Sequence, residues 1–210
     1  MLNRANLVAF GLVCALTLAV GCSSQTQGEK MVESFARTRE TLVKAQNQVD
    51  TTMITLLRLR QTRGEDLKDI FPLYKDAVAE LEAQGISAKR QAAGMKEQEH
   101  AYIMSWQEEM KNINDPNIKA TLQSRQQAVR SNFKLVQMYA DGARKAFDPF
   151  LKGNKEIVQA LSIDLSPPMV VSLAPAMDRA YADGQALKQR IAALRHALDS
   201  MANGASPIGH

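Results

Sequence analysis

Apolar residues recur every three or four positions through most of the chain, which places them on one face of successive α-helices. No segment has the alternating, valine-, isoleucine- and threonine-rich pattern that is typical of a strand. The pattern predicts four long helices: residues 29–62, residues 66–112, a third that begins at Pro116 and a last that begins at Pro167. The fold class that follows is all-α.

Two of these helices carry a coiled-coil repeat. In the first, Phe35, Leu42, Val49 and Leu56 recur every seven residues. Arg39 and Gln46 interrupt the companion positions, which lowers stability but can fix the register of the packed helices. In the last, apolar or small residues alternate by three and four positions: Val170, Leu173, Met177, Ala180, Gly184, Leu187, Ile191, Leu194, Leu198 and Met201. This spacing predicts an apolar seam along which the helix packs in a left-handed coiled coil.

Turn residues set the predicted helix boundaries. Gly64 ends the first helix, Asp115 caps the helix that Pro116 begins, and Ser166 caps the helix that Pro167 begins. Amphipathic helices joined by such short turns predict an elongated antiparallel bundle.

Two prolines are expected to disturb this regularity. Pro149 removes a backbone donor from the third helix and should kink or divide it, and Pro175 should distort the opening turns of the last. The bundle is predicted to cover residues 29–202, followed by a flexible tail over residues 203–210 of small and polar residues.

The N-terminus has the order of features found in a bacterial export signal. Arg4 precedes an uncharged run over residues 7–20, which is too short to span a bilayer but suits the core of a signal peptide. The segment Leu18-Ala19-Val20-Gly21-Cys22 resembles the lipobox, after which the cysteine is lipidated and becomes the first mature residue.

The resemblance divides the N-terminus into a signal peptide over residues 1–21 and a lipidated Cys22 on a short tether over residues 22–28. Ser23 and Ser24 follow the cysteine in place of aspartate, as in lipoproteins sent to an outer membrane. The protein is therefore expected to face the periplasm with palmitate-type acyl chains as its anchor. The alternative is a plain cleavable signal, with a free secreted bundle.

Composition narrows the possible partners. The chain has 210 residues, of which 45% are hydrophobic and 23% charged, so it is long and apolar enough to bury a core. The net charge of +4 is spread over interspersed basic and acidic residues, which favours no nucleic-acid partner. Both cysteines lie within the first 22 residues, so the body can form neither a disulfide nor a thiolate metal site.

Several short motifs in the body carry a family resemblance. They are Gly64-Glu65-Asp66-Leu67, Asp148-Pro149-Phe150-Leu151, Asp164-Leu165 and Val170-Val171-Ser172-Leu173. With them the chain resembles an uncharacterised family of bacterial helical proteins, often lipoproteins, known as a domain of unknown function; Pro167-Pro168 departs from its pattern. The resemblance implies coiled-coil-rich structure and brings no known activity or catalytic residues.

Candidate chemistry in the body is sparse. Glu97 and His100 have the spacing of a metal-binding pair, but a di-iron bundle needs a second such pair, and His196 has Ala193 three residues before it. A solvated helix face is the favoured interpretation, and no metal, cofactor or catalytic residue is predicted. No nucleophile-elbow, zinc-protease or phosphate-loop motif is present.

Beside a third hypothesis, an enzyme or metal site around Glu97 and His100, two kinds of function remain. The first is a non-enzymatic lipoprotein, anchored through Cys22, that acts through protein contacts or self-association along its helix faces. The second is a binding module for cell-wall polymer or anionic lipid through Arg58, Arg60 and Arg63 at the end of the first helix. Arginines at a helix C-terminus also suit the helix dipole without any ligand.

Overall fold

The structure is a computed structural model that describes residues 22–62 and 64–205, with side chains for residues 27–62 and 64–202. The predicted signal peptide, residues 1–21, lies outside the described residues. The helices are α1 (Cys22–Gln61), α2 (Leu67–Lys111), α3 (Pro116–Ile163), α4 (Pro167–Ser172) and α5 (Ala174–Ala205), with a 3₁₀ turn, η1 (Gly64–Asp66). The described part of the chain contains no strand, and none of its helices is both long and apolar enough to span a membrane.

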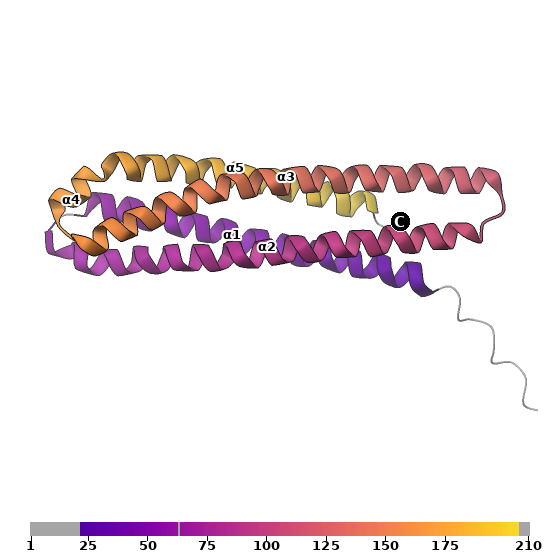
Figure 1. Cartoon of the computed structure of the whole chain (residues 1–210), viewed down its shortest axis with the longest axis horizontal. Coiled ribbons are helices and arrows are strands. Elements are labelled where there is room, and N and C mark those ends of the chain that lie inside the picture. The colour runs from indigo at the N-terminus through magenta and orange to yellow at the C-terminus, as the bar shows by residue number, and fades with distance from the viewer. Residues whose placement is uncertain (1–21, 63, 206–210) are drawn as a thin grey trace, which may run out of the picture.

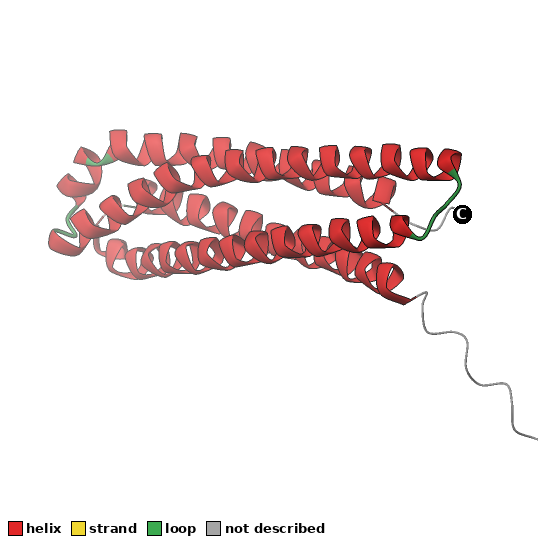
Figure 2. Cartoon of the chain, turned by 45° about the vertical axis from the view of Figure 1, so that its right-hand side comes forward, coloured by secondary structure: helices red, strands yellow, loops and turns green. Residues whose placement is uncertain are grey.

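The four long helices run antiparallel to their neighbours and form an elongated bundle (Figures 1 and 2). Around the bundle, α1 packs along α2 and α5, and α3 packs along α5 and α2. The short α4 lies with η1 at one end, and the α2–α3 turn lies at the other (Figure 1). The predicted all-α antiparallel bundle is confirmed.

The core follows the predicted seams. All four heptad residues of α1 are buried, as are nearly all the seam residues of the last helix. The aromatic side chains at the centre, Phe133 and Phe150, are 1% and 0% exposed and come from α3. Removal of these apolar faces from water is the main stabilising contribution to a bundle of this kind.

Polar side chains between α1 and α5 hold the two helices in antiparallel register. Arg39 contacts Asp199 at 3.2 Å, and the Gln46 side-chain oxygen accepts a hydrogen bond from Arg195 at 3.0 Å. The residues expected to interrupt the α1 seam therefore contact α5 at matching positions. Because the pairs are partly exposed, their effect is more on register than on stability.

The predicted helix caps are present. The Asp115 carboxylate accepts hydrogen bonds from the backbone N–H groups of Asn117 at 2.8 Å and Ile118 at 3.1 Å. The Ser166 hydroxyl accepts one from Met169 at 3.4 Å, and Gly64 has a φ of 73°, which favours glycine.

Replacing Asp115 by alanine is expected to lower the free energy of unfolding by about 1 kcal/mol, because two N–H groups at the start of α3 lose their acceptor. Urea denaturation measures this loss. Asp115→Asn is the matched control, since asparagine also caps, and an equal loss in both variants would contradict a capping role.

The two prolines behave differently. Pro175 separates α4 from α5 at Leu173, because it has no N–H to donate to the carbonyl four residues earlier. The expected division at Pro149 was wrong, since α3 continues unbroken to Ile163. Only one backbone hydrogen bond is lost there, and the buried Phe150 and Ile157 hold the following turns in the core.

The expected tether is also corrected. Helix α1 begins at Cys22, so residues 22–28 are helical, and α5 reaches Ala205. The single glycine of this stretch, Gly28, costs a helix only about 1 kcal/mol. It is buried, and a Cβ built on it would lie 3.8 Å from the Tyr102 ring, so packing on α2 supports the first turns. Residues 206–210 lie outside the described residues.

Candidate functional site

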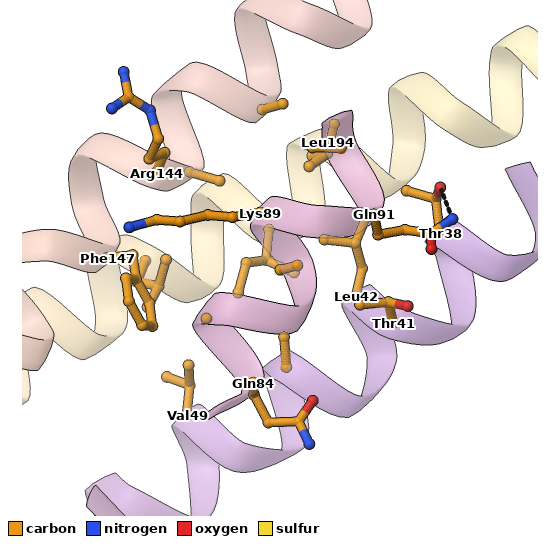
Figure 3. Close-up of a pocket in the computed structure, with 18 of the residues that line it drawn as sticks. Thr38, Thr41, Leu42, Val49, Gln84, Lys89, Gln91, Arg144, Phe147 and Leu194 are labelled. Atoms are coloured by element: carbon orange, nitrogen blue, oxygen red, sulfur yellow. Dashed lines mark hydrogen bonds between the residues drawn. The ribbon is translucent and has the colours of Figure 1, made fainter. Parts of the chain in front are cut away.

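The most distinctive feature of the described bundle is a cavity of about 220 Å³ near the middle of its length (Figure 3). All four long helices line it. The lining is mostly aliphatic and includes Leu42 and Val49 of α1, Leu81 and Met95 of α2, and Leu187, Ile191 and Leu194 of α5.

The cavity arises because small residues occupy adjacent core layers. They are Ala45 of α1, Ala88 of α2, and Ala140 and Ala143 of α3. On α3, bulky core residues precede and follow this stretch, namely Phe133 and Phe150. Protein interiors are normally close-packed.

The cavity opens between α2 and α3. Its exposed lining residues are Lys89, Ala92, Asp141 and Arg144, which all belong to these two helices. In Figure 3 the Lys89 side chain reaches from α2 toward α3, and its ammonium lies between Arg144 and Phe147.

The two cations at the opening are only loosely paired. Lys89 Nζ lies 4.0 Å from Asp148, and Arg144 Nε lies 3.7 Å from Asp141. All four side chains are more than half exposed, and such pairs contribute about 0–1 kcal/mol. A ligand anion could therefore replace either contact with little loss.

Phe147 forms one wall of the cavity by packing on a glycine. A Cβ built on Gly85 would lie 2.3 Å from the Phe147 ring, so only glycine lets the ring approach the α2 backbone this closely. The ring is only partly buried and lies beside the opening.

The polar groups at the other side of the cavity are bonded to one another. Gln91 donates a hydrogen bond to the Thr38 hydroxyl at 3.2 Å, and this hydroxyl donates to the Ser34 carbonyl at 2.8 Å (Figure 3). Because these groups satisfy each other, the interior presents an apolar surface suited to a hydrocarbon.

The two residues with metal-binding spacing, Glu97 and His100, do not line the cavity. Glu97 and His100 are exposed on α2, and among the described residues no three histidine, cysteine or acidic side chains are grouped as a metal site requires. The neighbouring Glu99 is half-buried, which raises the pKa of its carboxyl, although a 2.7 Å hydrogen bond from Gln137 partly opposes this.

The other predicted site residues lie far from the cavity. Cys22 is the first residue of α1, and its side chain lies outside the described residues. Arg58 is exposed at the opposite end of α1, and Arg60 makes a bidentate pair with Asp178 of α5. Arg63 lies outside the described residues.

The cavity was not predicted from the sequence. A signal for it exists, because Ala88 on α2, and Ala140 and Ala143 on α3, stand at buried or partly buried positions where larger residues are usual. Alanine is also an excellent helix former, so its clustering alone does not separate a hollow core from a tightly packed one.

A comparison with protein-family models finds one match, over residues 20–204, to a protein of unknown function (DUF2959). No match was found among curated proteins. The matched region covers every described helix almost completely, which confirms the resemblance to a domain of unknown function. The chain belongs to the DUF2959 family.

Proposed function

We propose that the protein is a non-enzymatic lipoprotein of the cell envelope, anchored through Cys22 and facing the periplasm, that acts as a structural or protein-interaction module. The observation that carries this proposal is the lipobox-like segment ending at Cys22, the residue at which α1 begins. An acyl anchor there would attach to the end of a rod instead of to a loose linker.

The rod would separate its two ends by a defined distance. Helix α1 has 40 residues and is about 60 Å long at about 1.5 Å per residue. It runs from Cys22 to the end of the bundle that holds η1 and α4 (Figure 1). With Cys22 in a membrane, this far end would be presented to partners well away from the bilayer.

The far end has the exposed apolar side chains that a protein contact would use. Ile163 at the end of α3 is 82% exposed and Val171 in α4 is 73% exposed, the highest values among the large apolar residues described. The seam of α5, in contrast, is buried within its own bundle. Contacts at the far end therefore require no opening of the fold, whereas pairing through the α5 seam would.

Photo-crosslinking in living cells tests this interaction. We expect a photoreactive residue at Ile163 or Val171 to yield a discrete crosslinked product, which Val171→Glu would reduce when the probe is at Ile163. Ile118, which is 54% exposed near the opposite end, is the matched control position. Equal crosslinking at both ends, or none at Ile163 and Val171, would contradict a partner at the far end.

The second candidate function is a binding module for cell-wall polymer or anionic lipid. It is supported by the exposed Arg58 near the same far end, although Asp178 neutralises Arg60. The position of Arg58, about 54 Å from Cys22 along α1, favours a polymer over the headgroups of the anchoring membrane. Binding that weakens steeply with salt would favour this candidate over an apolar protein contact.

A further inference from the structure

We propose that the cavity binds the hydrocarbon chain of an anionic single-chain amphiphile, a fatty acid, with the carboxylate at Lys89 and Arg144. This inference rests on the bundle alone and does not depend on the anchor at Cys22.

The shape of the cavity suits one alkyl chain. Its lining on α1 extends from Thr38 to Val49, which is about 16 Å at about 1.5 Å per residue. A volume of about 220 Å³ spread over that length is a narrow slot. It exceeds the engineered apolar cavities of about 150 Å³ that bind benzene. One extended chain fits such a slot better than the paired chains of a phospholipid.

The chemistry of the lining favours the same ligand. Leucine, isoleucine, valine, methionine and alanine supply most of the wall, and the Thr38 and Gln91 groups are bonded to each other. An alkyl chain would fill space that the side chains leave empty, and no polar group of the lining would lose a hydrogen bond.

The opening holds cations that a negatively charged headgroup would use. Lys89 and Arg144 stand there with one lining acid, Asp141, and with Asp148, whose carboxylate lies 4.0 Å from Lys89 Nζ. Arg144 Nε lies 3.7 Å from Asp141, and Figure 3 shows its guanidinium directed away from the Lys89 ammonium. A ligand carboxylate at Lys89 would replace the long contact to Asp148 with a charge-assisted hydrogen bond, and a turn of the Arg144 side chain toward the opening would add a second.

Entry would take place along the α2–α3 seam. Ala92 of α2 is exposed at this opening, and the Phe147 ring stands beside it against Gly85. A turn of this one side chain widens the opening without a change in the backbone.

Calorimetric titration of the full-length Cys22→Ser protein with dodecanoate, below its micelle concentration, tests the proposal. The substitution keeps acyl groups of the protein itself out of the assay. We expect one dodecanoate per chain, bound at least about tenfold more tightly than dodecyltrimethylammonium, which has the same chain and the opposite charge.

Two variants locate the site. Lys89→Ala with Arg144→Ala should weaken dodecanoate binding about tenfold while leaving dodecanol binding unchanged, since only the headgroup contact is lost. Lys134→Ala with Lys152→Ala removes the same charge from exposed positions outside the lining and should have no effect. Ala143→Leu should abolish binding of both ligands by filling the slot.

Three results would overturn the proposal. They are no saturable binding of dodecanoate, equal affinity for the anionic and cationic amphiphiles, and an affinity for dodecanoate that is unchanged in the charge variant. The charge variant changes only exposed side chains and should stay folded. It therefore tests the headgroup contact even if Ala143→Leu unfolds. Cys22→Ser is present throughout, so the result is independent of whether the natural protein is lipidated.

Discussion

Replacing Phe150 by alanine should lower the free energy of unfolding by about 3–5 kcal/mol. Phe150 is 0% exposed in a closely packed layer of the bundle. A Cβ built on Gly184 would lie 2.9 Å from its ring and 2.7 Å from the Met53 sulfur, so three helices already meet there without spare room. The void left by the ring is therefore expected to stay open.

Urea denaturation of Phe150→Ala beside Phe147→Ala measures this effect. Phe147 comes from the same helix but is only half-buried and lies beside the cavity, so its loss should cost about 1–2 kcal/mol. Equal losses in the two variants would show that the Phe150 layer is no tighter than the cavity region.

The second large effect concerns a buried polar pair between α2 and α3. The Tyr74 hydroxyl donates a hydrogen bond to the Asn154 side-chain oxygen at 2.8 Å, and the Asn154 amide donates to the Phe150 carbonyl at 2.7 Å. Both residues are 0% exposed. Tyr74→Phe should cost about 1–3 kcal/mol, because the buried Asn154 side-chain oxygen loses its donor. Asn154→Leu should also destabilise the fold, because it leaves the Tyr74 hydroxyl only the more distant backbone carbonyl of residue 154, at 3.3 Å.

A double-mutant cycle separates this pair from general packing. Because the Tyr74→Phe, Asn154→Leu double variant leaves neither side-chain partner unmatched, it should cost clearly less than the sum of the two single changes. Strict additivity, measured by urea denaturation, would mean that the hydrogen bond does not couple the two helices.

Burial of Tyr74 also predicts a loss of stability at alkaline pH. Burial raises the pKa of the Tyr74 hydroxyl well above its ordinary value of about 10. The unfolded chain therefore releases this proton first, so stability is complete below about pH 10 and falls above it by about 1.4 kcal/mol per pH unit. Tyr74→Phe should show a shallower decline than the natural chain between about pH 9 and about pH 11. An equally steep loss of stability with pH in the two proteins would contradict this role of Tyr74.

The helices and their buried faces could be predicted from the sequence because one physical rule, burial of a 3.6-residue stripe, decides both. Phe35, Leu42, Val49 and Leu56 are buried as their spacing indicated, and Asp115 and Ser166 cap their helices. The break before Pro175 follows from a missing N–H group, which is a local property.

What could not be predicted depends on contacts between distant segments. Pro149 stays within α3 because core packing outweighs one lost hydrogen bond, and Gly28 is held in α1 by Tyr102. The cavity depends on how far apart four helices stand around Ala88, Ala92, Ala140 and Ala143. Residue spacing along one helix carries no information on that distance.

Membrane fractionation of the full-length protein beside a Cys22→Ser variant, with labelled palmitate, tests the proposed lipoprotein most directly. We expect the natural chain to take up label and to pellet with membranes, while the variant does neither. The serine change preserves the small polar side chain, so the bundle should be equally folded in both. Equal, soluble behaviour of the two proteins without label would contradict the anchor and leave a free secreted bundle.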